Sequence, residues 1–340
     1  MSDKRFTRSL LILIVAMLGT TILSGGSEVT PLFAAHNTNR GEGTTQPTSD
    51  DFDSCILDTD LWEYTDPLGD APYSTNGSQV TIGLAAGVVH DLWVDKQAPR
   101  LMQEISNGDF SIEAKFESAV TQQFQIQGIV VEQDSENLLR FDFFHDGENV
   151  RLFAAILRGS SPAQQFSIPL TVPDTVVGYF IRVFRSGDSW LTSYSFTGNA
   201  DDWTSVQRFD TSLTVTKVGI FGGNVSPGVG QDPPAHTVIA DFFFNSNATI
   251  AQEDDNAIET LNLSVVGEGS VSPESGEYSC GPQTLLATPT EGWDFAGWSG
   301  ALTSTQNPAV LEMNGVQDVT ATFVEVDNGN TLVYLPFTTQ

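Results

Sequence analysis

The sequence predicts an all-β protein whose strands pair antiparallel. Between residues 50 and 245, short runs that alternate apolar and polar residues recur about every ten residues, as half-buried strands do. Gly, Asp, Asn and Pro separate these runs and favour turns. No stretch after residue 26 keeps a helical periodicity over about ten residues. Many evenly spaced strands joined by turns indicate an antiparallel sandwich or barrel.

Alternation within each run predicts which side chains share a face. In 137–146 one face is apolar and the other is mixed, and Arg140 and Asp142 lie on the mixed face. Arg182 similarly lies on a mixed face of 178–187, and Tyr194 shares a face with three other residues of 189–198. Further strands are expected at 111–120, 124–132, 149–157, 215–223 and 237–245.

The N-terminus has the parts of an export signal. Lys4, Arg5 and Arg8 form a basic region, and the apolar run at 10–23 is too short for a comfortable transmembrane span. Small residues at 24–26 then offer a cleavage point. We therefore expect a secreted or cell-surface protein. An uncleaved anchor, which would be its only contact with a membrane, is the alternative.

Composition divides the chain into segments. Polar stretches without periodicity read as linkers, and the final tail contains the apolar run "LVYLPF", which is either a last strand or a sorting tail. The expected segments are a signal peptide at 1–26, a linker at 27–49, a large β domain at 50–246, an acidic linker at 247–260, a small β module at 261–325 and a tail at 326–340.

The chain is strongly acidic. It has 14 Lys and Arg residues against 43 Asp and Glu residues, a net charge of −29 and an isoelectric point near 4.1. Such a chain repels phosphate backbones and anionic membranes, so nucleic-acid binding is not expected. The acidity serves solubility in one interpretation and affinity for Ca²⁺ in another, because carboxylates are preferred Ca²⁺ ligands.

Two cysteines are present, Cys55 and Cys280. In an oxidising compartment they would be able to pair, and closing so long a loop would stabilise the fold by at most about 5 kcal/mol. Sequence does not tell whether their Cα atoms come close enough for a bond. The sequence is therefore compatible both with a Cys55–Cys280 disulfide and with two free thiols.

The segment 261–325 resembles the divergent InlB-type β-repeat, a bacterial repeat domain. The resemblance rests on "GEGSVSP", "TLLATPTEGWDFAGWSG" and "LEMNGVQDVTATF". It implies a surface spacer or adhesion module. Because so small a module has few apolar groups to bury, we expect "EGWDFAGWSG" to be scaffold, with Trp293 as its one candidate for exposure. The expected core is Phe295, Trp298, Leu286 and Phe323.

Residues 50–246 resemble the concanavalin A-like domain found at the C-terminus of β-xylosidases. The resemblance rests on "DDFDSCILDTDLWEYTDPLGDA", "QIQGIVVEQDSENLLRFDFF" and "SYSFTGNADDWTSVQRF". It implies a two-sheet antiparallel jelly roll with a concave face, which in such folds often holds carbohydrate. The fold by itself does not fix the function.

Five residues are candidates for a ligand-binding face: Trp93, Arg140, Asp142, Arg182 and Tyr194. Aromatic rings stack on the apolar face of a pyranose, and charged groups form hydrogen bonds with its hydroxyls. Trp93 lies in a segment between two expected strands, as lectin tryptophans do. The alternative is that the arginines pair with aspartates across strands and that the rings are packing.

The motif "EQDSE" requires a test for catalysis. Its acids, Glu132, Asp134 and Glu136, have the spacing of jelly-roll retaining glucanases, which place alternate carboxylates in one cleft. The context differs, because polar residues separate the acids and "DSEN" favours a turn. We expect a hairpin tip with solvated carboxylates, and no enzyme activity.

A structural Ca²⁺ is the one cofactor that the sequence suggests. Asp51 and Asp53 open the large domain and Asp241 lies near its end. Terminal strands of a jelly roll usually pair, so these carboxylates are candidates to converge on a cation. Ordinary surface aspartates are the alternative. The four histidines show no metal-ligand spacing.

The sequence therefore predicts an exported protein without catalytic activity, which binds polysaccharide or a cell-surface glycan weakly on the concave face of the jelly roll. A structural or adhesion protein without a glycan site is the alternative. A glycoside hydrolase is a third hypothesis.

Overall fold

A computed structural model describes residues 45–251 and 258–326. The predicted signal peptide, most of the linker at 27–49, part of the linker at 247–260 and the tail from residue 327 lie outside these residues. Within the described ranges, no helix is long and apolar enough to cross a membrane.

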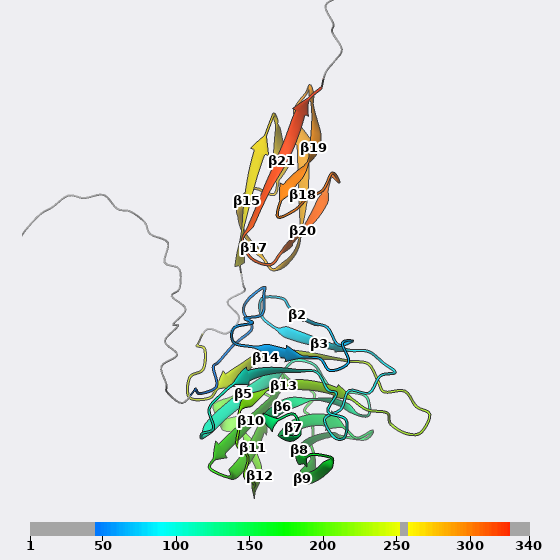
Figure 1. The fold of residues 1–340 in the computed structure, drawn as a ribbon, viewed down its shortest axis with the longest axis vertical. Helices are drawn as coiled ribbons and strands as arrows, with labels where there is room; N and C mark the ends of the chain where they lie inside the picture. Colours follow the sequence, from blue (N-terminus) through cyan, green and yellow to red (C-terminus); the bar gives the residue numbers. More distant parts are fainter. Residues whose placement is uncertain (1–44, 252–257, 327–340) are drawn as a thin grey trace, which may run out of the picture. The chain divides into compact units, whose positions relative to one another are not determined.

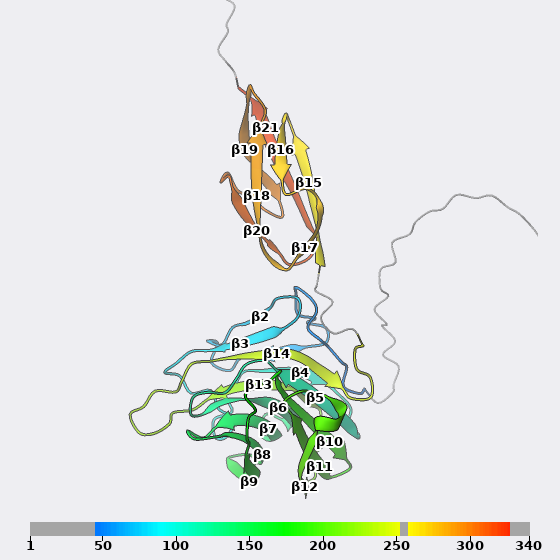
Figure 2. The ribbon, with the colours of Figure 1, turned by 180° about the vertical axis from the view of Figure 1, so that it is seen from behind.

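The large domain consists of two seven-stranded sheets that lie face to face (Figures 1 and 2). Every pair of neighbouring strands in them is antiparallel. Sheet I has the order β1 (Glu63–Thr65), β4 (Arg100–Glu104), β13 (Lys217–Asn224), β6 (Gln125–Asp134), β7 (Asn137–His145), β8 (Val150–Arg158), β9 (Ser161–Pro169). Sheet II has the order β12 (Thr204–Asp210), β11 (Ser189–Ser195), β10 (Tyr179–Ser186), β5 (Phe110–Phe116), β14 (His236–Asn245), β3 (Val80–Leu84), β2 (Tyr73–Thr75).

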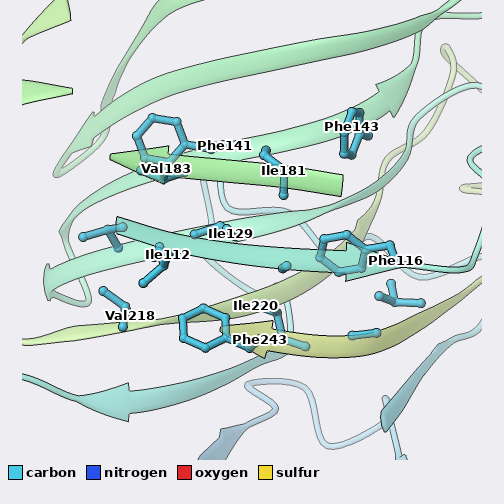
Figure 3. Packing of buried hydrophobic residues seen from close by; sticks show 14 of the residues in the cluster. Ile112, Phe116, Ile129, Phe141, Phe143, Ile181, Val183, Val218, Ile220 and Phe243 are labelled. Atoms are coloured by element: carbon cyan, nitrogen blue, oxygen red, sulfur yellow. The ribbon is translucent and has the colours of Figure 1, made fainter. Parts of the chain in front are cut away.

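The core of the sandwich lies between the two inner faces. Alternate residues of each central strand point inward, as the period of two requires. Figure 3 shows Phe141 and Phe143 of sheet I beside Ile181 of sheet II, and Ile220 of sheet I beside Phe243 of sheet II; all of these side chains are fully buried. The predicted all-β antiparallel jelly-roll sandwich is confirmed.

The C-terminal module is a second, smaller β structure. One sheet has the order β17 (Gly276–Ser279), β15 (Ile258–Val266), β21 (Gln317–Glu325), β19 (Trp293–Gly300), and the other has the order β16 (Gly269–Ser272), β18 (Gly281–Pro289), β20 (Ala309–Met313). Strands β15 and β21 pair in parallel. The remaining pairs of the module are antiparallel.

The motif "EGWDFAGWSG" contains all of β19, and its second tryptophan is scaffold as predicted. Trp298 is buried with Phe323, and its indole N–H donates to the carbonyl of Gln306 at 3.0 Å. Trp293 and Phe295 pack against this core while staying partly exposed. Gly300 has a φ of 95°, and a Cβ there would lie 2.2 Å from the carbonyl oxygen of Asp318, so only glycine fits.

One predicted core residue of the module is wrong. Leu286 is 44% exposed, and its neighbour Leu285 is fully buried in its place. Successive residues of β18 point to opposite faces, so an error of one residue in the register exchanges the two leucines.

Candidate functional site

The outer face of sheet I is covered by residues 85–99, the segment between β3 and β4, which we call the cover loop. Leu92 and Ala98 of this loop are fully buried and pack with Met102, Val130 and Phe221 of the sheet. These five residues belong to a second apolar cluster, which is separate from the core between the sheets. The side chains of sheet I that lie beneath the loop are therefore removed from solvent.

Arg140 and Asp142 lie under the cover loop as a closed ion pair. The Arg140 Nε donates to Asp142 Oδ2 at 2.7 Å and its Nη2 donates to Asp142 Oδ1 at 3.0 Å. Nη1 donates to Asp91 of the cover loop at 3.3 Å. The guanidinium lies 5.3 Å from the ring centroids of both Phe153 and Phe221, at a distance that favours cation–π attraction.

Burial governs the electrostatics of this pair. Burial raises the pKa of the Asp142 carboxyl, and the Arg140 guanidinium offsets part of that rise. Strand β6 leaves little space opposite, because Gly128 is the register partner of Asp142 and a Cβ there would lie 2.2 Å from the carbonyl oxygen of Phe141. Two of the predicted ligand-binding residues thus satisfy each other in a closely packed layer.

Two clusters of polar contacts hold the cover loop in place. The Lys96 Nζ donates to Glu136 Oε2 at 2.7 Å and to the carbonyl of Gly159 at 2.8 Å. The ring nitrogens of buried His90 lie 2.9 Å from Asn224 Oδ1 and 2.9 Å from Asp70 Oδ1. The position of Trp93, between these two attachments in the sequence, is therefore fixed by contacts on both sides.

Trp93 begins a row of four aromatic rings on the outer face of sheet I, which we call the ring row. The Trp93 ring lies 5.9 Å from Phe153, Phe153 lies 5.7 Å from Phe144, and Phe144 stacks on Phe124 at 6.3 Å. Phe153 is buried, and the other three rings are partly exposed. The structure brings Trp93 near the Arg140–Asp142 pair through Phe153, and it leaves Trp93 accessible to solvent.

A cationic group lies beside the ring row. Arg151 of β8 is the register partner of Phe144. Its Nη1 donates to Asp146 at 2.9 Å, and its Nε donates to the Ser167 hydroxyl at 2.8 Å. Sequence reasoning did not select Arg151, Phe144 or Phe124. The alternation of 137–146 does place Phe144 on the face of Arg140 and Asp142, and this signal was sufficient to find it.

Arg182 and Tyr194 lie away from this site, whereas the sequence analysis placed all five candidates on one ligand-binding face. Arg182 lies on the outer face of sheet II, where its Nη2 donates to Glu113 at 2.6 Å and its guanidinium stacks on Trp203 at 3.9 Å. Tyr194 packs against the core between the sheets and contacts Phe196. The five predicted residues are divided among two outer faces and the interior.

The acids of "EQDSE" take three different environments. Asp134 closes the β6–β7 hairpin by accepting from the backbone N–H groups of Glu136 and Asn137, both at 2.9 Å. Glu136 is exposed beside it, as predicted for a hairpin tip. Glu132 differs from the expected solvated carboxylate, because it is buried 2.6 Å from the Arg100 Nε. Burial raises the pKa of Glu132, and Arg100 acts in the opposite direction.

The carboxylates suggested for calcium are not gathered into one site. Asp241 lies at a bulge of β14, and its Oδ2 accepts from the Lys115 Nζ at 2.7 Å. The described residues contain no group of three or more His, Cys, Asp or Glu side chains placed to hold a metal ion. Calcium binding by Asp51, Asp53 and Asp241 stays a prediction.

Cys55 and Cys280 form a disulfide in the structure. Their Cα atoms are 5.3 Å apart, and 225 positions of sequence separate them. Cys55 precedes β1 of the large domain, and Cys280 follows β17 of the C-terminal module. The two domains are thus joined by this bond as well as by the chain between β14 and β15.

Comparison with known proteins gives one family match, at residues 260–327, to the divergent InlB B-repeat domain. The C-terminal module is similar to that family, as its sequence pattern predicts. No curated protein sequence matches the chain.

Solved structures with a similar fold include the GH43 protein BlXynB from Bacillus licheniformis. It is 17% identical with a TM-score of 0.45, over 58% of this chain and 38% of that protein. The CBM2 module of the evolved Dit protein of a Lactobacillus casei phage is 9% identical, with a TM-score of 0.40 and coverages of 59% and 96%. The carbohydrate-binding module CBM66 from Bacillus subtilis is 11% identical, with a TM-score of 0.34 and coverages of 53% and 91%. Similarities this distant say nothing about what the present chain binds.

Proposed function

We propose that this chain is an exported protein without catalytic activity, and that its jelly roll binds polysaccharide weakly at the ring row. The observation that carries the proposal is the partial exposure of Trp93, Phe144 and Phe124 beside Arg151 on one face of sheet I. Rings of this kind stack on sugar faces, and a guanidinium forms hydrogen bonds with hydroxyls.

Weak binding follows from the polar groups near the ring row. Arg140 and Asp142 already satisfy each other, and Arg151 already donates to Asp146 and Ser167. Because these three groups are already engaged within the protein, we expect stacking to supply most of the binding free energy. Specificity for one glycan is then low as well.

The positions of the acidic residues support the non-catalytic part of the proposal. Glu132 is buried against Arg100, and Glu136 is exposed and bonded to Lys96. A retaining glycosidase needs two carboxyl groups about 5 Å apart facing one substrate. Export is proposed from the basic and apolar segments of residues 1–26.

The second candidate is a structural or adhesion protein of the cell surface without a glycan site. The closed pairs Arg140–Asp142 and Arg182–Glu113 favour it, because both satisfy within the protein the groups that a sugar would need. In this case the ring row is packing at the margin of the cover loop.

A polysaccharide and glycan panel with residues 27–340 distinguishes these candidates, in the presence of calcium and of chelator. Saturable binding that falls with Trp93→Ala and persists with Trp203→Ala supports the ring row. Binding that falls with Trp203→Ala alone would move the site to Arg182 on sheet II. Absence of binding to every glycan would favour the structural candidate, and loss with chelator would implicate a bound cation.

A further inference from the structure

The disulfide between Cys55 and Cys280 closes a covalent loop with a sequence separation of 225. Every strand of sheets I and II lies inside this loop, since β1 begins at Glu63 and β14 ends at Asn245. Strands β15, β16 and β17 of the C-terminal module lie inside it too, and β18 to β21 lie outside. The bond is thus a covalent path from one domain to the other that bypasses every strand of sheets I and II, with residues 45–54 of the large domain on the way to it.

We infer that this disulfide is a tension-bearing clasp, which keeps the jelly roll folded when the chain is pulled at its two ends. Tension follows the shortest covalent path between the points where it is applied. It enters along the N-terminal segment, reaches Cys55, crosses the sulfur–sulfur bond and continues from Cys280. Residues 56–279 lie off that path, so the covalent chain of sheets I and II is not pulled. Load reaches the sandwich through the contacts of residues 45–54, such as the Asp50–Phe243 bridge and the buried Phe52 ring.

Strand register in the C-terminal module determines how the rest of the path carries load. Ser279, beside Cys280, is the register partner of Ile258 at the beginning of β15. Because β15 and β21 run parallel, Cys280 lies at the end of the module where β21 begins. Glu325 ends β21 at the opposite end. Pulling at Glu325 therefore loads β21 along its length. The parallel hydrogen bonds between β21 and β15 are then sheared together.

The biological use of the clasp rests on the proposed surface role, in which one end of the chain is held while the other is pulled. The path itself does not depend on glycan binding, since it follows from connectivity. An oxidising compartment preserves such a bond, so export and the clasp require the same environment.

Single-molecule stretching of residues 27–340 between handles at the two ends tests the inference. Each unfolded residue adds roughly 3.5 Å of length, so the loop, with its sequence separation of 225, holds back about 790 Å. With the bond intact, we expect unfolding to release only residues 45–54 and 281–326, at most about 200 Å. Adding reductant to the same molecule is expected to permit a further release approaching about 790 Å.

Cys55→Ser and Cys280→Ser are matched controls, because either change opens the same loop. Both variants are expected to give the long release without reductant and to ignore its addition. Should the variants fail to fold, reducing an individual oxidised chain gives the same comparison. A long release from oxidised wild-type protein, or two titratable thiols in the exported protein, would overturn the clasp. A negative glycan panel would leave this result unchanged.

Discussion

Arg140 and Asp142 stand two residues apart on β7 and form a two-pronged ion pair, with donor–acceptor distances of 2.7 and 3.0 Å. Both side chains project from the same face of the strand, as its period of two requires. The cover loop adds Asp91 to the pair, and the rings of Phe153 and Phe221 flank the guanidinium. The polar side chains that alternation places on the outer face of β7 are therefore buried and paired with each other.

Breaking this pair from one side is expected to be costly. Arg140→Ala leaves the Asp142 carboxylate buried without its partner, and losses of about 3–5 kcal/mol are typical of such changes. The free energy of unfolding from urea denaturation measures the effect. The double change Arg140→Met with Asp142→Leu removes both charges and is expected to recover most of the loss. A free energy of unfolding for Arg140→Ala within about 1 kcal/mol of the wild-type value would contradict a buried pair.

Removing the Trp93 ring is expected to weaken glycan binding. An aromatic contact contributes about 0.5–1.5 kcal/mol beyond the area that it buries, so Trp93→Ala lowers the affinity up to about tenfold. Trp93→Phe keeps a stacking surface and is expected to lose less. Isothermal titration with the best glycan of the panel measures both. Equal affinities for wild type and Trp93→Ala would exclude the ring row as the site.

His236 makes stability depend on pH. Burial lowers the pKa of its imidazole from 6.5 to about 4, and its Nε2 lies 3.2 Å from Gln127 Oε1. Because the folded-state pKa lies below the unfolded value, the neutral ring contributes stability that is complete above pH 6.5 and is lost as the pH falls towards 4. The loss over this range is on the order of 3 kcal/mol.

His236→Gln keeps a hydrogen-bond donor and removes the titrating group. Urea denaturation of both proteins from about pH 7.5 to about pH 4 is expected to show a steeper decline for wild type. The difference between the two isolates His236 from the many carboxylates that also titrate in acid. Parallel curves would mean that His236 is solvated or protonated in the folded protein.

Leu285 and Leu286 provide a matched pair for the C-terminal module. Leu285→Ala empties a buried site, and such changes cost about 2–5 kcal/mol. Leu286→Ala removes a side chain that is 44% exposed, so its effect is expected to stay within about 0.5 kcal/mol. Thermal unfolding of each variant checks the order. The reverse order would place β18 in the other register.

The divided site shows how far sequence patterns reach. Alternation correctly grouped Arg140 with Asp142, and Tyr194 with Trp190. It did not tell that the face of Tyr194 is the interior of the sandwich while the face of Arg140 is an exterior covered by a loop. Both faces combine apolar and polar residues. Which face points inward depends on how the two sheets pack against each other.

Residues missed at the ring row illustrate the same limit. Phe144 belongs to a face that alternation identifies. Phe124 opens the expected strand 124–132, but in the structure it precedes β6 with a φ of 65°. Its ring reaches Phe144 because the chain turns just before the strand. Alternation gives only the face of each residue, and the contact depends on which strands pair.

Sequence patterns predict antiparallel strands in a sandwich or barrel and the turn at "DSEN", because strand periodicity and turn chemistry are properties of neighbouring residues. The jelly roll and the β-repeat were expected from resemblance to known families. Sequence patterns do not predict that Asp91 accepts from Arg140, that Lys96 of the cover loop donates to Glu136, or that Cys55 pairs with Cys280. These contacts join residues far apart in the chain, and their formation depends on how whole strands and loops pack. The ring row and the clasp are both consequences of that packing.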